Sequence, residues 1–249
     1  MRRFALLAAT GALLMACTAP PTSPIPPKRV SNDVEVRTAG TVIHDVRIEG
    51  SVDVYAPNVT IRRVRITCGA YWCIRQHEGA SGLLVEDADI GPEQTRSEAD
   101  GIWAESFTGR RLNIHNVSDG IKAWSHVYVA ESHIHALSMG VSDHSDGVQV
   151  QGGSDIVLER NDIEAGTNAA VFLSSDQSAV TDVVIRDNRL SNGTFTMLVR
   201  TGPYGPPRRV QVERNRFAGR AKYGPFSSDI GVAMVGNVQE ATGHPVTGT

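Results

Sequence analysis

The chain has 249 residues, 41% of them hydrophobic and 20% charged, a balance typical of a globular protein and not of a disordered one. Its formal net charge of -3 provides no broad basic surface, so the composition excludes nucleic acid as an expected partner. Aromatic residues make up only 6% of the chain, so the positions of the few that occur are informative.

The N-terminus has the pattern of a targeting segment. Two arginines precede an apolar stretch over 4–16 that is too short to span a bilayer. The stretch ends in Leu-Met-Ala-Cys at 14–17, which resembles a bacterial lipobox. That resemblance implies a signal peptide over 1–16, cleavage before Cys17 and a lipid on the Cys17 thiol. The alternative is an ordinary secretory signal cut nearby.

A proline-rich stretch follows the targeting segment. Residues 17–30 contain five prolines, which favour an extended tether between the lipid and the folded domain over 31–249. Two further cysteines, Cys68 and Cys73, lie close together in an exported chain and predict a small disulfide loop. The loop is too short to stabilise much by chain entropy, so we expect it to fix a local excursion that carries Tyr71 and Trp72.

One apolar phrase recurs through the domain. It reads apolar-x-apolar-x-x-(small or Asn)-x-apolar, and alternation at period two predicts strand on each side of a bend. Repetition at about 20 to 30 residues indicates a stacked repeat architecture. Its occurrences are Val59–Ile66, Leu83–Ile90, Val127–Ile134, Ile156–Ile163, Val183–Leu190 and Val210–Phe217.

A parallel coil explains these repeats better than a meander of hairpins. Asparagines occupy equivalent positions at 161, 188, 215 and 237, and in a parallel stack their amides would lie about 4.8 Å apart and form a hydrogen-bonded ladder. Stacked rungs also bury a continuous core that no single rung buries alone. The phrases at 112–117 and 127–129 are unusually close, so either that rung is tight or one phrase is misassigned.

At this point the chain resembles an all-β, single-stranded right-handed parallel β-helix of the pectate-lyase-like class. It is similar to exported bacterial β-helix proteins that carry a His-(Ser/Thr)-Asp-Gly-(Ile/Val)-Gln segment, here at 144–149, and a Tyr-Gly-Pro segment, here at 223–225. The resemblance covers roughly 40–240. It implies the fold, but the class includes lyases, hydrolases, esterases, epimerases and non-catalytic binders.

The Asp-Gly-apolar strands predict one external face that suits a sugar polymer. Their apolar residues point inward, so the residues that follow point outward. Indoles stack on sugar rings, and cations neutralise uronate or sulfate. The alternative is a solvated sheet face. The expected substrate-binding residues are Arg75, His77, Trp103, Glu105, Trp124, Gln149, Gln151 and Arg200, with Lys122 and Phe172 on the same face.

Carboxylates and one histidine are candidates for catalysis. Asp100, Asp119 and Asp146 each precede Gly; turn chemistry alone would account for them, whereas stacking on successive rungs would raise one pKa. His144 lies beside Asp146 in the longest insertion next to this face and suits a general acid or base, unless it is a solvated surface histidine. The candidate catalytic residues are His144, Asp146, Lys122 and Asp119.

Three functions remain open from the sequence. The first is cleavage of an acidic polysaccharide by β-elimination, with Lys122, Arg75 or Arg200 neutralising the uronate and His144 or Lys122 as the base. The second is hydrolysis by Asp119 and Asp146, with Glu105 in reserve. The third is non-catalytic glycan binding or a structural role.

Cofactors and partners follow from the same residues. We assign no metal site, because a zinc site built from His115, His133 and His135 would lie away from the tryptophan face. Calcium held by carboxylate oxygens is left open, with no residues to identify it. We expect a monomer that is exported to the cell envelope, anchored to a membrane through Cys17, and bound to a polysaccharide.

Overall fold

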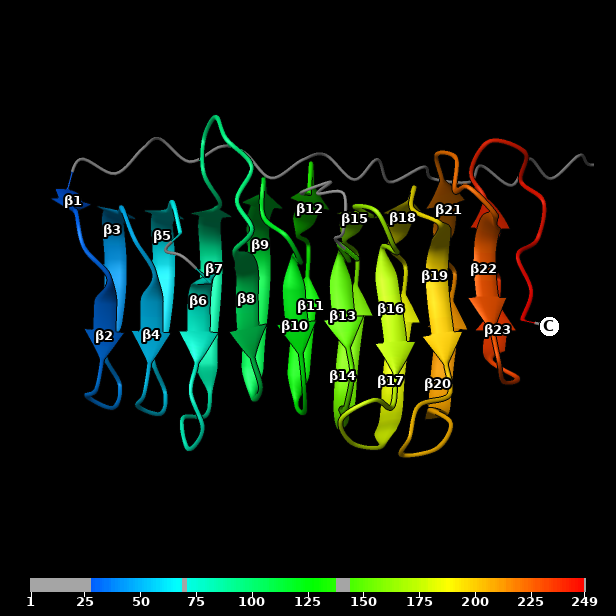
Figure 1. The fold of residues 1–249 in the computed structure, drawn as a ribbon, viewed down its shortest axis with the longest axis horizontal. Coiled ribbons are helices and arrows are strands. Elements are labelled where there is room, and N and C mark those ends of the chain that lie inside the picture. Colours follow the sequence, from blue (N-terminus) through cyan, green and yellow to red (C-terminus); the bar gives the residue numbers. More distant parts are fainter. Residues whose placement is uncertain (1–27, 69–70, 138–143, 249) are drawn as a thin grey trace, which may run out of the picture.

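The computed structural model describes residues 28–68, 71–137 and 144–248. Within these ranges all regular structure is β-strand, and the strands stack in parallel along one axis as a coil (Figure 1). The described residues include no helix that is long and apolar enough to cross a membrane. The fold is therefore the right-handed parallel β-helix that the repeats and the resemblance predict.

Two sheets form the walls of the coil in the described ranges. The nine strands of sheet B run β2 (Val34–Val36), β4 (Val52–Val54), β6 (Trp72–Gln76), β8 (Asp100–Ala104), β10 (Ile121–Ala123), β13 (Val148–Val150), β16 (Val171–Ser174), β19 (Phe195–Arg200) and β22 (Gly224–Ser228).

Sheet A is longer and bends around the remaining sides of the coil. Its strands are β1 (Lys28–Val30), β3 (Val42–Ile48), β5 (Thr60–Ile66), β7 (Leu83–Ile90), β9 (Phe107–His115), β11 (Val127–Ala130), β12 (His133–His135), β14 (Gly153–Glu159), β15 (Asp162–Glu164), β17 (Val180–Arg186), β18 (Arg189–Ser191), β20 (Arg208–Glu213), β21 (Arg216–Ala218), β23 (Ala233–Val235) and β24 (Val238–Gln239).

The closely spaced phrases belong to one tight rung. Val127 pairs with Phe107, so this turn of the coil takes 20 residues, whereas the next turn pairs Val127 with Ile156. The rung is tight, and the phrase at 112–117 is also misassigned, because it starts at Phe107 and Leu112 lies opposite Ser132.

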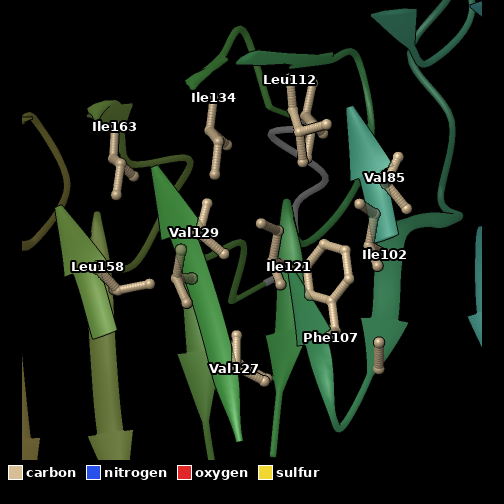
Figure 2. Close-up of a cluster of buried hydrophobic side chains, with 14 of the residues drawn as sticks. Val85, Ile102, Phe107, Leu112, Ile121, Val127, Val129, Ile134, Leu158 and Ile163 are labelled. Carbon is tan, nitrogen blue, oxygen red and sulfur yellow. The ribbon is translucent and has the colours of Figure 1, made fainter. Parts of the chain in front are cut away.

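The interior is filled by rows of branched apolar side chains. Val85, Val129 and Leu158 come from β7, β11 and β14 of sheet A, and Ile102 and Ile121 face them from sheet B (Figure 2). All five are completely buried. Because each rung supplies only a few such residues, the core is stable only as a continuous stack.

Each long strand of sheet A bends at a residue with positive φ. In β5 the bend is at Arg63, with φ of 49°, and its neighbours along the stack, Asp45 and Asp87, both have φ of 52°. The charges at this bend alternate from rung to rung. The column reads Asp45, Arg63, Asp87, Arg111, Glu131, Arg160, Asp187 and Arg214.

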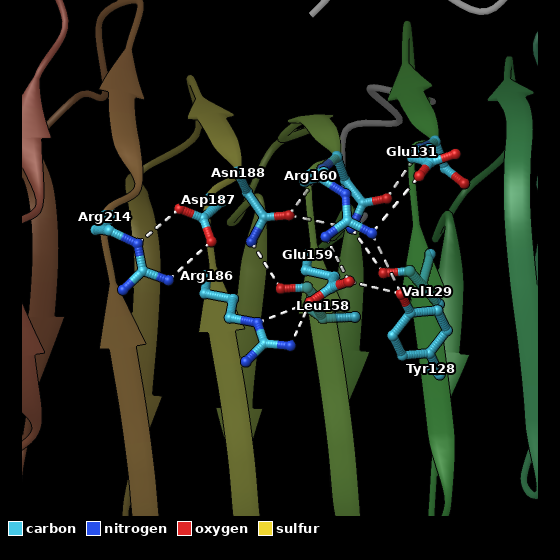
Figure 3. A network of polar contacts seen from close by, with 12 residues as sticks. Tyr128, Val129, Glu131, Leu158, Glu159, Arg160, Arg186, Asp187, Asn188 and Arg214 are labelled. Carbon is cyan, nitrogen blue, oxygen red and sulfur yellow. Dashed lines mark hydrogen bonds and ion pairs between the residues drawn. The ribbon is translucent and has the colours of Figure 1, made fainter. Parts of the chain in front are cut away.

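Ion pairs join the members of this bend column. Nε of Arg63 lies 2.7 Å from Asp45, Nε of Arg111 lies 2.6 Å from Asp87, and Nε of Arg214 lies 2.8 Å from Asp187. Beside the column, Glu159 accepts hydrogen bonds from Tyr128 and Arg186 (Figure 3). Most of these side chains are about half exposed, so solvent screens each pair and its contribution to stability is small.

The asparagine ladder predicted from the repeats is confirmed. Asn161 donates from Nδ2 to Oδ1 of Asn188 at 3.1 Å, Asn188 donates to Asn215 at 3.0 Å, and Asn215 donates to Asn237 at 3.0 Å. Each Oδ1 also accepts the backbone N–H of the preceding asparagine at 2.9 Å. All four residues are buried, and the bend residue itself lies one position before each asparagine.

The predicted disulfide between Cys68 and Cys73 is present, and it sits at the start of β6. Next to it, Trp72 donates from Nε1 to Oδ1 of Asp53 at 3.1 Å, and the guanidinium of Arg75 lies 4.4 Å from the ring centroid of Trp72. The side chain of Tyr71 is exposed. The disulfide therefore holds an indole against the outer face of sheet B.

Replacing Asn188 by Ala tests the ladder. Four buried hydrogen bonds through its side chain are lost, including the one that Nδ2 donates to the Leu158 carbonyl (Figure 3). We expect urea unfolding to show a loss of about 3 kcal/mol, because the abandoned partners stay buried. Gln211→Ala, on the exposed side of β20, is the control, and an equal small effect of both changes would contradict this account.

Gln76 is the reverse case, a buried amide whose polar atoms are unpaired. Its side chain lies in the core, and neither its amide nitrogen nor its amide oxygen has a hydrogen-bond partner among the described residues. Gln76→Met keeps the length of the side chain and removes the unpaired polar atoms, so we expect a gain of about 1 kcal/mol in the free energy of unfolding. A loss of stability in urea unfolding would show that this amide is satisfied in solution.

Candidate functional site

The outer face of sheet B carries a row of side chains in strict register. Arg75 pairs with Trp103, Trp103 with Lys122, and Lys122 with Gln149 on four successive rungs. A second row, two residues further along each strand, contains His77, Glu105, Trp124, Gln151 and Arg200. The structure thus places on one face all the residues that the sequence predicts there.

Trp103 lies between two cations. The guanidinium of Arg75 lies 4.7 Å from its ring centroid, and Nζ of Lys122 lies 5.5 Å from the same centroid. The two cations come from the rungs on either side, so they cover opposite faces of the indole. Stacking of a sugar ring on Trp103 stays a prediction, and a sugar there would compete with these two cations for the faces of the indole.

Trp124 lies beside a small notch in the same face. Lys122, Gln149 and Gln151 line the notch with it. Its volume of about 60 Å³ is room for roughly two water molecules, so it suits one substituent of a sugar and not a whole ring. Gly152 makes space for the indole, because a Cβ there would lie 3.0 Å from Cζ3 of Trp124.

The three aspartates stack at the start of the sheet B strands. Oδ1 of Asp100 accepts the backbone N–H of Asp119 at 3.4 Å, and Oδ1 of Asp119 accepts that of Asp146 at 2.7 Å. Oδ1 of Asp146 accepts the backbone N–H of Ala169 and Nδ2 of Asn168, both at 2.9 Å. Each carboxylate therefore caps the next rung, as turn chemistry predicts, and the carboxylates also form the predicted stack.

The ammonium group of Lys122 contacts two members of this aspartate stack. Its Nζ lies 2.7 Å from Oδ2 of Asp100 and 3.3 Å from Oδ2 of Asp119. Oδ2 of Asp146 accepts from Nε2 of Gln149, at 3.2 Å. The ammonium thus contacts two of the three carboxyl groups, and buried carboxyl groups next to one another are the condition that raises carboxyl pKa values.

The electrostatics of the aspartate stack follow from burial and like charge. Burial raises the pKa of Asp119. Burial and the neighbouring Asp119 raise the pKa of Asp146 well above its ordinary value. Although burial disfavours its charge, Asp100 and Asp119 together raise the pKa of Lys122.

These shifts change the roles that two candidate residues can take. Because the pKa of Lys122 is raised, its ammonium stays protonated at neutral pH, which argues against Lys122 as a base. Asp146 is completely buried, so its carboxyl group has no exposed surface for contact with a substrate. Asp119 keeps 7% of its side chain exposed, beside the more accessible Nζ of Lys122.

His144 is exposed and lies two residues before Asp146 in the sequence. The backbone N–H of the next residue, Ser145, donates to Oγ1 of Thr167 at 3.0 Å. Within the described ranges, His144 itself makes no hydrogen bond or ion pair with the aspartates. The predicted Cys17 and part of the insertion that contains His144 lie outside the described residues.

The remaining predicted residues are held by partners near the ends of the face. Nε2 of His77 lies 2.7 Å from Oδ1 of Asp53, and its ring stacks on Tyr55 at 4.0 Å between centroids. Arg200 donates to Oγ of Ser227 at 3.0 Å. Arg75 has no ion pair in the described part of the chain, so it is a cation available to an anionic ligand.

Several participants were not identified from the sequence. Asp53, Tyr55 and Trp72 build the end of the face next to Arg75, and Gln177 donates from Nε2 to Oε1 of Gln151 at 2.9 Å. The outward position of Asp53 and Tyr55 on β4 was the signal that could have revealed them, because β4 precedes β6 in the stack.

The histidines of sheet A form a separate cluster. The rings of His133 and His135 stack at 3.9 Å between centroids, and His115 lies 5.7 Å from His135. Burial and the neighbouring histidines lower the pKa of His135 to about 4, so it is neutral at pH 7. Among the described residues, no group of three or more His, Cys, Asp or Glu side chains could hold a metal ion.

The geometry agrees with the comparisons with known proteins. The sequence profile of the family described as right handed beta helix region matches residues 95–237, more than half of the chain. The chain belongs to that family. No curated protein matches the sequence.

Solved structures match the fold at low identity. A mutant of the periplasmic alginate epimerase AlgG is 15% identical, with a TM-score of 0.64, and the match covers 79% of this chain and 50% of that one. The tailspike protein of E. coli bacteriophage HK620, in complex with a pentasaccharide, is 14% identical over 83% of this chain and 44% of that one, with a TM-score of 0.59. The A-module of the mannuronan C-5 epimerase AlgE4 from Azotobacter vinelandii is 14% identical over 88% of this chain and 76% of that one, with a TM-score of 0.53. The chain thus spans about half the length of the first of these structures.

The raised pKa of Asp146 predicts a pH dependence of stability. A carboxyl group whose pKa is higher in the folded than in the unfolded state binds more protons when folded, so stability falls as pH rises from about 4 through the folded pKa. Asp146→Asn removes this effect. We therefore expect the free energy of unfolding of the variant to rise relative to that of the wild type as pH increases from 4 to 8. The expected rise is about 1.4 kcal/mol for each unit by which the folded pKa exceeds the unfolded pKa.

Urea unfolding at several pH values measures this gain. Asp155→Asn, at a carboxyl group with 69% of its side chain exposed, is the control. Wild-type and Asp146→Asn stability curves that stay parallel across the range would refute the raised pKa.

Proposed function

We propose that this protein is an exported, lipid-anchored glycan-binding β-helix that binds an acidic polysaccharide on the outer face of sheet B. The observation that carries the proposal is the row formed by Arg75, Trp103, Lys122 and Gln149, in register and beside Trp124. The similar structures include two alginate epimerases and a tailspike with a bound oligosaccharide, which supports a polysaccharide as the ligand class.

The chemistry of the row favours an acidic chain. Arg75 has no ion pair among the described residues, and its guanidinium is fixed between two indole rings, at 4.4 and 4.7 Å from their centroids. A guanidinium held in this way loses little rotamer entropy on binding and presents its edge for bidentate contacts to a carboxylate or sulfate. The side-chain amides of Gln149 and Gln151 then form hydrogen bonds with sugar hydroxyls.

Lipid anchoring rests on the sequence at 14–17. A lipid on Cys17 followed by the proline-rich tether would hold the β-helix near the membrane while leaving sheet B accessible. Export is consistent with the disulfide between Cys68 and Cys73.

We further propose that the bound chain is cleaved by β-elimination at the aspartate stack. This reaction needs a cation on the uronate carboxylate, a base for the C5 proton and an acid for the leaving oxygen. Arg75, with Lys122, supplies the positive field, and the exposed His144 serves as the base. Asp119 acts as the acid, because burial raises its pKa and favours the protonated carboxyl group.

Hydrolysis is the second candidate, and one distance favours it. Oδ2 of Asp100 and Oδ2 of Asp119 share the same Nζ within 3.3 Å, so the two oxygens lie less than roughly 6 Å apart. Retaining glycosidases use carboxyl groups about 5 to 5.5 Å apart. By this mechanism protonated Asp119 is the acid and ionised Asp100 the nucleophile.

The test uses uronate-containing and neutral polysaccharides, with and without calcium. Ultraviolet absorbance reports unsaturated uronyl ends, and a reducing-end assay reports every cleavage. Both signals rise for a lyase, and reducing ends alone rise for a hydrolase. Binding without either product identifies a non-catalytic glycan-binding protein and removes the catalytic assignments.

Substitutions separate binding from turnover. Trp124→Ala should weaken glycan binding about tenfold, because it removes the wall of the notch, whereas Tyr204→Ala, at an exposed aromatic residue in the connection between β19 and β20, should not. His144→Ala should lower turnover at least a hundredfold with unchanged affinity. His244→Ala, at another exposed histidine, is its control, and equal rates for the two histidine variants would remove His144 from the mechanism.

A further inference from the structure

A trough runs along the edge where sheet A passes into sheet B, separate from the notch beside Trp124. It has a volume of about 560 Å³, within the range of ligand sites. Its lining includes small residues of the short connections, such as Ala165, Gly166 and Gly193. The longer connections β7–β8 and β21–β22 rise beyond the sheet edge (Figure 1) and contribute its cationic ends.

Cations dominate this trough. Arg96 comes from the β7–β8 connection, and Arg220 and Lys222 come from the β21–β22 connection. Glu164 is the acidic residue in the lining. Within the described ranges none of the three cations forms an ion pair, whereas every arginine of the bend column is paired. Nζ of Lys222 lies 4.9 Å from the ring centroid of Tyr223.

The shape and the charge together indicate a polymer. Its lining residues come from five connections between sheet A and sheet B, namely β7–β8, β12–β13, β15–β16, β18–β19 and β21–β22, so the trough crosses several rungs that are each about 4.8 Å apart. A small anion would need cations gathered at one point, whereas here they stand at both ends. Cations along a concave surface focus a positive potential that attracts an extended anion.

We propose that this trough binds a linear anionic oligosaccharide segment, with Arg96 at one end of the segment and Arg220 and Lys222 at the other. The inference rests on the proposed function and extends the glycan-binding surface from the outer face of sheet B around the edge of the sheet. Its ligand class is a chain of sugars that carry carboxylate or sulfate groups.

The edge is connected to the candidate site through hydrogen bonds. Thr194, in the lining of the trough, donates from Oγ1 to the carbonyl of Asn168 at 3.0 Å, and Asn168 donates to Oδ1 of Asp146. Thr167, also in the lining, accepts from the backbone of Ser145, next to His144. The trough lining is therefore linked by hydrogen bonds to the residues around Asp146.

The test compares matched pairs of substitutions in the full chain. Arg220→Ala/Lys222→Ala removes two charges from the trough, and Lys28→Ala/Arg208→Ala removes two exposed charges elsewhere. Calorimetry measures binding of a galacturonic acid hexamer, a sulfated hexamer and neutral cellohexaose. We expect the trough variant to bind one or both anionic hexamers at least tenfold more weakly, with a shallower dependence on salt, and the control to bind like the wild type.

The outcomes distinguish failure of the trough proposal from failure of the proposed function. Anionic binding that stays at the wild-type level in the trough variant but falls in Trp124→Ala overturns the trough and leaves the sheet B site standing. Equal weakening of cellohexaose also overturns it, because charge would then not be the cause. A wild-type protein that binds none of the three hexamers overturns both proposals. The carboxylate and sulfate hexamers identify which anion the trough accepts.

Discussion

The in-register stacking of rungs about 4.8 Å apart is the constraint on which the rest of this structure depends. Every side chain lies next to its equivalents on the rungs above and below, so each column must be compatible with itself. Three chemical solutions appear. Apolar columns fill the core, asparagines such as Asn188 donate and accept along the axis, and charges at the bend alternate in sign. Columns of like charge repel at every step, and the coil contains two kinds. The arginines Arg29, Arg47 and Arg65 stack in register, and each has an ion pair, whereas the aspartate stack is buried.

The bend column shows how this constraint combines with backbone conformation. Residues at the bend take positive φ, which costs a non-glycine residue on the order of 1 kcal/mol. Glycine would avoid that cost but would leave no side chain to join the rungs. The charged residues offset part of it through pairs such as Arg111 with Asp87, and the direction of the pKa shifts agrees, since Arg111 lowers the pKa of Asp87. The alternation of charge also specifies which rung stacks on which, because a stack that skipped one rung would place like charges next to each other in the bend column.

The sequence predicted the columns well, but it did not predict how long side chains pack within a column or how the long connections run. Alternation at period two assigns Trp103 and Lys122 to the outer face, and the recurrence of Asn161 and Asn188 predicts the ladder, because both follow from periodicity alone. That Trp103 is covered by Arg75 and Lys122 depends on the rotamers of long side chains, which no spacing specifies. The trough depends on two long connections that are distant in sequence and whose paths no repeat encodes.

The aspartate stack places like charges on successive rungs and buries them, and its placement is informative for that reason. Asp100 and Asp119 share one ammonium, and burial raises the pKa of Asp119 and of Asp146. Serine or asparagine would cap the same backbone N–H groups without this electrostatic cost, as Ser132 and Asn161 do elsewhere in the coil. Capping alone therefore does not explain why carboxyl groups occupy three consecutive rungs. An arrangement that opposes folding and lies beside an indole, an amide row and an exposed histidine is where chemistry on a bound chain is expected.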